Sequence, residues 1–226
     1  MMIFMNAEGK HPIRGVPDDT PGVCYRSSKK GWMTQRLFRE YLSERKAMRA
    51  DPHGRNKTIY LDNCSGHLEA DQCQDELNSI NADLQFFPLN ATDLCQPADS
   101  FIIAKIKDAR WNAKKLSLIK ENCWQNNIRM DGSWSGKLQN PGKTFFLQLA
   151  ADAVRDVNHQ KDKNGMSYAR KAMIRCGLSL GIDGTWSVAQ LYPHLQDVVA
   201  KHRAHFEGEP VTSTPDTQKS STAPGE

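Results

Sequence analysis

The sequence predicts an α/β fold. Two short runs at residues 58–61 and 84–87 are rich in β-branched and aromatic residues, which is typical of buried strands. Between them, apolar residues recur every three or four positions, as on one face of an amphipathic helix. The two runs and the helix form a strand–helix–strand unit. Acidic residues follow its strands, where open α/β sheets place their chemistry.

Composition narrows the class of protein. At 226 residues, the chain is long enough for one domain with a hydrophobic core and a helical addition. Its formal net charge is +4. The six cysteines form no CxxC pair, which argues against a zinc site or a disulfide scaffold and favours reduced thiols in an intracellular protein. No apolar run is long enough to cross a membrane, so we expect no membrane partner.

The N-terminal part is predicted to begin with strands. Residues 1–5 indicate a strand that turns at 6–9, and residues 11–16 suggest a second strand. Residues 17–30 are rich in Pro and Gly and are predicted to form a loop. Thr34 then suits the N-cap of a helix that reaches about Ala47.

The C-terminal part is predicted to be helical. A stripe of apolar residues predicts a long helix after residue 99: Ile102, Ile106, Ala109, Ala113 and Leu116. Further helices are expected around 146–157, over 168–177 and from Pro193 onward. The Pro-, Ser- and Thr-rich tail is predicted to be disordered. The expected divisions are a core at 1–125, a helical extension at 126–206 and the tail at 207–226.

Three motifs in the central region follow one another in a recognisable order. They are LDNCSGH at 61–67, FPLNATDL at 87–94 and QPAD at 96–99. This set resembles the catalytic core of the DDE endonucleases of pogo, Tigger and jerky type transposases, whose pattern is LDNAPGH, LPPNTT and QPLD. The resemblance extends over roughly residues 1–200 and is strongest at 58–107.

The resemblance implies a ribonuclease-H-like fold, with a mixed sheet between helices and a C-terminal helical region. In that family, the first catalytic Asp lies on the strand before the one that would correspond to residues 1–5. We therefore expect a sheet without its first strand and a catalytic set without its first acid. The resemblance implies metal-dependent phosphodiester cleavage in the ancestral enzyme, impaired here. The alternative is a non-catalytic nucleic-acid-binding or interaction protein derived from a transposase.

The resemblance assigns catalytic, metal-binding roles to Asp62 and Asp99. Two divalent cations can stabilise the attacking and leaving oxygens of phosphodiester cleavage, and Mg²⁺ or Mn²⁺ suits carboxylate ligands. Each acid also has a structural interpretation, because Asp62 could close a turn and Asp99 could complement a helix dipole. Asn63, His67 and Gln96 are expected to line the site, although a lone histidine such as His67 is more often a capping or packing residue.

Basic residues after Asp99 suggest a DNA-binding surface. The expected phosphate contacts are Lys105, Lys107, Lys114 and Lys115, on the polar side of the long helix. An ordinary solvated helix face explains the same residues equally well. The resemblance implies DNA as the partner and the nucleus as the location.

Overall fold

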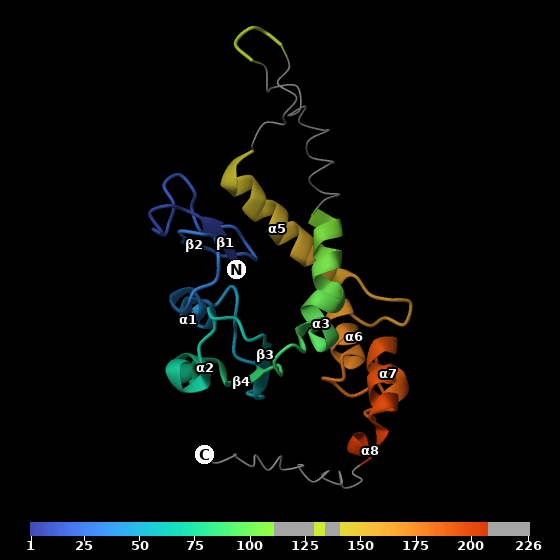
Figure 1. Cartoon of the computed structure of the whole chain (residues 1–226). Helices are drawn as coiled ribbons and strands as arrows, with labels where there is room; N and C mark the ends of the chain where they lie inside the picture. The colour runs from blue at the N-terminus through green and yellow to red at the C-terminus, as the bar shows by residue number, and fades with distance from the viewer. Residues whose placement is uncertain (111–128, 134–140, 208–226) are drawn as a thin grey trace, which may run out of the picture.

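The computed structural model describes residues 1–110, 129–133 and 141–207 (Figure 1). Within them, four strands form two separate two-stranded sheets, and both pairs are parallel. The pairs are β1 (Met2–Met5) with β2 (Tyr25–Ser28), and β3 (Lys57–Leu61) with β4 (Ala82–Phe86). The chain is thus a mixed α/β protein, but the single mixed sheet implied by the resemblance is not formed by the described residues.

The predicted strand–helix–strand unit is confirmed. β3 and β4 pair from Lys57 opposite Ala82 to Leu61 opposite Phe86. They are connected through η1 (Ala70–Cys73) and α2 (Gln74–Ile80). One hydrophobic cluster holds this unit to α1 (Gln35–Ser43), and its buried members are Phe38, Leu42, Leu61, Leu68, Cys73, Leu77, Ile80 and Ala82.

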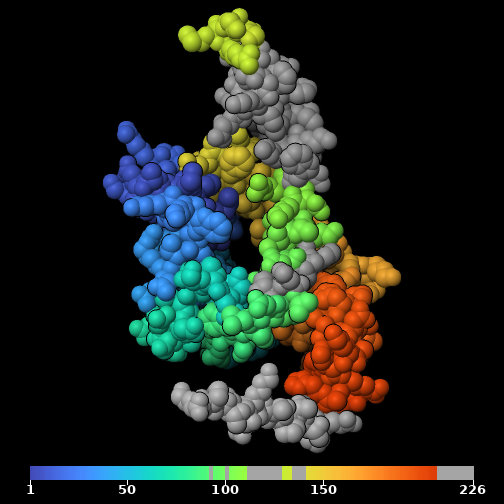
Figure 2. Space-filling model, viewed as in Figure 1, coloured from blue at the N-terminus to red at the C-terminus, as the bar shows by residue number. Residues whose placement is uncertain are grey.

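The β1–β2 pair buries a different cluster. Val23 and Tyr25 pack with Leu147 and Ala151 of α5 (Gly142–His159), a helix that comes much later in the chain. Figure 1 shows α5 running beside the two strands, and in the space-filling view of Figure 2 the blue N-terminal residues lie against the dark yellow residues of this helix. The helical extension and the N-terminal strands therefore share a core.

Two predictions for this region were wrong. Residues 11–16 form turns rather than a strand, because the Tyr25 hydroxyl accepts a hydrogen bond from the Ile13 amide at 2.8 Å and donates one to the Val16 carbonyl. The predicted loop at 17–30 contains β2, whose strand conformation depends on pairing with β1.

A network of ion pairs centred on Arg26 connects β2 to α1. Its guanidinium lies 2.8 Å from Glu40, 2.9 Å from Glu44 and 3.0 Å from Asp18, and the side chain is 13% exposed. Thr34 caps α1 as predicted, because its side chain accepts a hydrogen bond from the Leu37 amide. The helix ends at Ser43 rather than near residue 47.

The C-terminal elements are helical, as predicted. A π-helical turn, η2 (Ala98–Ile102), leads into α-helical residues 103–110. Ile102, Ile106 and Ala109 of the expected stripe are half-buried, whereas Ala113 and Leu116 lie outside the described residues. The remaining elements are α3 (Thr92–Cys95), α6 (Tyr168–Arg175), η3 (Val188–Gln190), α7 (Pro193–Lys201) and α8 (Arg203–Phe206).

Two further expectations concern thiols and membranes. Cys24 and Cys73 are buried free thiols, and Cys64 is an exposed one. None of the described helices is long and apolar enough to span a membrane. The tail predicted to be disordered lies, from residue 208 onward, outside the described residues.

Candidate functional site

Asp62 directly follows the last residue of β3, at the carboxyl edge of the β3–β4 pair. Its side chain is 37% exposed, so one side of the carboxylate faces solvent while the other faces protein. Oδ1 is the inward oxygen: it is buried and accepts no well-aligned hydrogen bond from the described residues. Its polar neighbour is Nδ1 of His67, at 3.0 Å.

His67 lies beside this carboxylate and contacts the backbone of the same residue. Its Nδ1 lies 3.0 Å from both the Asp62 carbonyl oxygen and Asp62 Oδ1. Because a carbonyl oxygen only accepts hydrogen bonds, Nδ1 is the donor in this contact. The ring is 15% exposed, and its centroid lies 5.0 Å from that of Phe38 in α1. His67 thus packs against Phe38 and lies beside Asp62, and its role in lining a site stays a prediction.

Two contacts fix the loop that carries these residues. The Asn63 side-chain amide donates to the Phe87 carbonyl at 2.7 Å, which ties the ends of β3 and β4 together. Gly66 lies so close to Met33 that a Cβ atom there would stand 2.6 Å from the Met33 carbonyl oxygen. Only glycine allows this approach, so the acid-bearing loop is wedged against the turn before α1.

Asp99 is placed by a different element. It lies in the first turn of η2, after the buried Pro97 that precedes this turn, and it is exposed. Gln96 is half-buried just before it. Within the described residues, no three His, Cys, Asp or Glu side chains gather in a way that could hold a metal ion. A cation shared by Asp62 and Asp99 stays a prediction, and the Asp62 carboxylate, whose buried Oδ1 accepts no hydrogen bond from the described residues, would be one of its ligands.

The predicted basic surface is described only in part. Lys105 is half-buried, with its ammonium 5.2 Å from the centre of the Tyr168 ring, which is a cation–π geometry. Lys107 is exposed. Lys114 and Lys115 lie outside the described residues.

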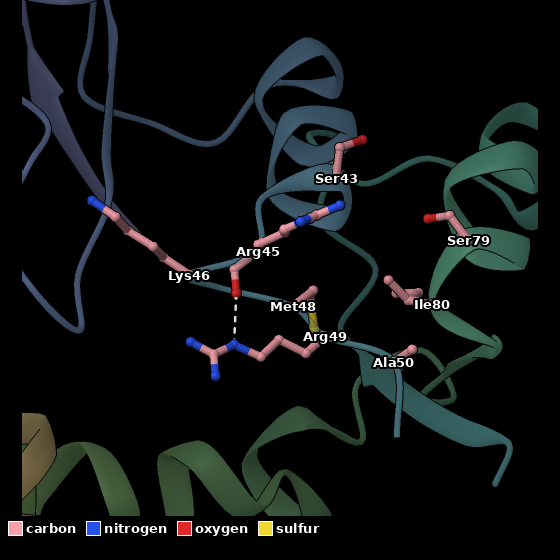
Figure 3. A pocket seen from close by; sticks show the side chains of 8 residues that line it. All are labelled: Ser43, Arg45, Lys46, Met48, Arg49, Ala50, Ser79 and Ile80. Carbon is pink, nitrogen blue, oxygen red and sulfur yellow. Dashed lines mark hydrogen bonds between the residues drawn. The ribbon is translucent and has the colours of Figure 1, made fainter. Parts of the chain in front are cut away.

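The structure shows a basic pocket that the sequence reasoning missed (Figure 3). Its volume is about 620 Å³, and it is lined by Ser43, Arg45, Lys46, Met48, Arg49, Ala50, Ser79 and Ile80. In Figure 3, the Arg45 and Arg49 side chains extend in opposite directions. Within the described part of the chain, neither guanidinium forms an ion pair. The Arg-Lys-x-x-Arg spacing at 45–49 was the available signal.

The positive charge of Arg45 and Arg49 is not neutralised by Glu44, because the Glu44 carboxylate is turned towards Arg26. Glu44 binds Arg26, and the Lys46 amide, helped by Arg26, holds the pKa of Glu44 below its ordinary value. The Ser43 and Ser79 hydroxyls donate back to helix carbonyls. Donors to a ligand would therefore be cationic side chains. The pocket lies near the start of β3, so a five-residue strand, roughly 15 Å long, separates it from Asp62.

Comparison with known proteins identifies the family. The family of DDE superfamily endonucleases matches residues 1–163, which include the β3–β4 unit, Asp62 and Asp99. No curated protein and no solved structure matches significantly. The matched segment spans more than half of the 226 residues. This chain therefore belongs to the DDE superfamily endonuclease family.

Proposed function

We propose that this chain is a transposase-derived endonuclease domain that acts on DNA. The observation that carries this proposal is the placement of Asp62 at the carboxyl edge of a parallel strand pair, with a buried Oδ1 3.0 Å from His67 Nδ1, in a chain of this family. The motifs at 61–67, 87–94 and 96–99 favour the pogo, Tigger and jerky branch. We also propose that the two strand pairs correspond to parts of a ribonuclease-H-like sheet.

Asp62 and Asp99 would be the protein ligands of Mg²⁺ or Mn²⁺, with waters and a DNA phosphate as further ligands. Such ions, when bound, would stabilise the negative charge on the attacking and leaving oxygens. The chain itself supplies orientation. His67 Nδ1 lies 3.0 Å from Asp62 Oδ1, and Asn63 fixes the loop relative to β4.

A nicking assay tests the proposal. The full chain is incubated with supercoiled plasmid in Mg²⁺ or Mn²⁺, and nicked product is quantified on gels. Because the resemblance implies a set without its first acid, we expect weak cleavage, which falls to background in Asp62→Asn and in Asp99→Asn. Asp71→Asn is the matched control, because Asp71 is an exposed acid near the same loop. Cleavage that persists in Asp62→Asn, or no cleavage in either metal, contradicts the proposal.

A second candidate function is DNA binding without cleavage. One observation favours it: the pocket at Arg45 and Arg49 presents guanidinium groups that form no ion pair within the described residues. It predicts salt-dependent DNA binding by a protein that does not cut. The lysines at 105, 107, 114 and 115 would contribute phosphate contacts. If charge reversal at Lys114 and Lys115 leaves the affinity unchanged, these lysines do not contact DNA.

A DNA partner also implies a location in the nucleus, which microscopy of a tagged chain would test.

A further inference from the structure

A large aromatic side chain stands out from the surface beside the acid-bearing loop. Trp32 is 73% exposed, yet its backbone is held firmly. The Ser28 hydroxyl donates to the Trp32 carbonyl at 2.9 Å. Gly31 adopts φ = 73°, and a Cβ atom there would stand 3.4 Å from the Met5 amide nitrogen. The indole is thus presented on a fixed turn rather than on a loose loop.

The surroundings of Trp32 are cationic. It borders a hollow of about 420 Å³ that is also lined by Lys29, Lys30 and Arg36. Both lysines are exposed, and neither forms an ion pair within the described residues. Arg36 is bound to Glu40 and to the Ser27 carbonyl, so the free charge comes from the two lysines.

This turn adjoins the candidate catalytic loop. The Met33 carbonyl, one residue after Trp32, is the group that Gly66 approaches. His67, which lies beside Asp62, follows Gly66 and packs against Phe38 of the helix that the same turn begins. A strand bound at Trp32 would therefore lie close to the acid-bearing loop.

We propose that Trp32, Lys29 and Lys30 form a subsite for an unpaired nucleotide, with the base stacked on the indole and the flanking phosphates on the two ammonium groups. The proposal rests on DNA as the substrate in the proposed function. Aromatic platforms with cations beside them are the common means of holding single strands. A second copy of this chain fits less well, because a symmetric contact through Trp32 would bring the lysines of the two copies together.

The stacking arm of the test measures binding by fluorescence anisotropy, with a labelled single-stranded oligonucleotide and the full chain in EDTA. Trp32→Ala is expected to weaken binding roughly 5- to 100-fold without changing its salt dependence, because stacking releases no counterions. Trp32→Phe should retain affinity to within about threefold. Trp186→Ala is the matched control, since Trp186 is also an exposed tryptophan at 48%. A blunt duplex should respond less to Trp32→Ala, because its bases are already stacked.

The ionic arm uses Lys29→Gln with Lys30→Gln. Each lost phosphate contact should reduce the slope of log K against log salt by about 0.7 for a single strand. Lys163→Gln with Lys201→Gln removes the same charge from other exposed sites and should leave the slope nearly unchanged.

Three results overturn the subsite: unchanged affinity in Trp32→Ala, an equal loss in Trp186→Ala, or a loss of self-association in Trp32→Ala seen by sedimentation. The binding assay requires no metal and no cleavage. A protein that never cuts but loses affinity in Trp32→Ala refutes only the nuclease proposal. A protein that cuts through Asp62 and binds equally well as Trp32→Ala refutes only the subsite.

Discussion

The two parallel strand pairs differ in what stabilises them. β3 and β4 are joined by their own connecting helix, α2, and share a core with α1, so nearly all of their partners lie close in sequence. β1 and β2 bury Tyr25 and Val23 against Leu147 and Ala151, which come from a distant helix. A contact between distant residues requires closing a long loop, which costs conformational entropy.

The candidate acid belongs to the strand pair whose stabilising contacts lie close in sequence. Asp62 follows β3, and Asn63 and His67 make their contacts within the β3–β4 unit and α1. We expect the β1–β2 pair to open more readily than β3–β4, because its core is smaller and assembled from distant segments. The following predictions test that ranking.

Phe38→Ala should have the largest effect. Phe38 is 1% exposed in the β3–β4 core and also supports the His67 ring. Truncating it should lower the free energy of unfolding by about 3–5 kcal/mol, measured by denaturant titration. Phe38→Leu should cost far less, on the order of 1 kcal/mol. A loss below about 1 kcal/mol in the alanine variant would show that this core is not the main stabilising element.

Leu147→Ala should destabilise the β1–β2 pair and leave the β3–β4 pair nearly unaffected. Its side chain is 1% exposed against Tyr25, and its truncation should cost about 2–5 kcal/mol. Hydrogen exchange should accelerate in β1 and β2 and change little in β3 and β4. Leu149→Ala is the control, because Leu149 is buried in the same helix but outside the β1–β2 cluster. Equal acceleration in both pairs would mean that they unfold as one unit.

Tyr25→Phe should loosen only one end of the β1–β2 pair. It removes the hydroxyl that bonds to Ile13 and Val16, and it leaves the backbone groups of these half-buried residues without that partner. We expect a loss of about 1–3 kcal/mol and faster exchange of the Ile13 amide. If exchange at Ile13 does not change, the turn at 11–16 is held by other contacts.

His11→Gln should have the smallest effect, and only in acid. Burial, followed by the charge of Arg26, lowers the pKa of His11 below its ordinary 6.5. As pH falls below 6.5, the unfolded chain takes up this proton before the folded chain does, so the folded state loses stability until pH passes the lowered pKa. In His11→Gln, the melting temperature should therefore depend less on pH in that range. The Glu44 pKa is also lowered, mainly by the Lys46 amide, so its contribution is lost at still lower pH. An unchanged pH profile would contradict this assignment.

Local sequence was enough to predict β3, α2 and β4, because their periodicity and composition are set within each segment. β2 was missed because Tyr25-Arg26-Ser27-Ser28 is largely polar, and its conformation depends on pairing with Met2–Met5. Residues 11–16 contain apolar side chains that suggested a strand, but they pack around the Tyr25 ring and hydroxyl instead.

In the candidate site, too, local sequence predicts some features, while others depend on contacts between distant segments. The motif singled out Asp62, Asn63 and His67, which lie in one short loop after β3, and their roles stay a prediction. It could not show that His67 Nδ1 contacts Asp62 Oδ1, because that depends on how the loop folds back. The cationic pocket at Arg45 and Arg49 depends on Glu44 turning towards Arg26, a contact between segments distant in sequence.

The close approach of Gly66 to Met33 has a mechanical consequence. Because Gly66 has no side chain, its backbone packs directly against the Met33 carbonyl. We therefore expect a displacement of one of these two segments to displace the other. A ligand that moves the turn at Trp32 would then also move Asp62, and a ligand that moves Asp62 would also move Trp32. The Trp32 turn and the Asp62 loop would thus move together rather than independently.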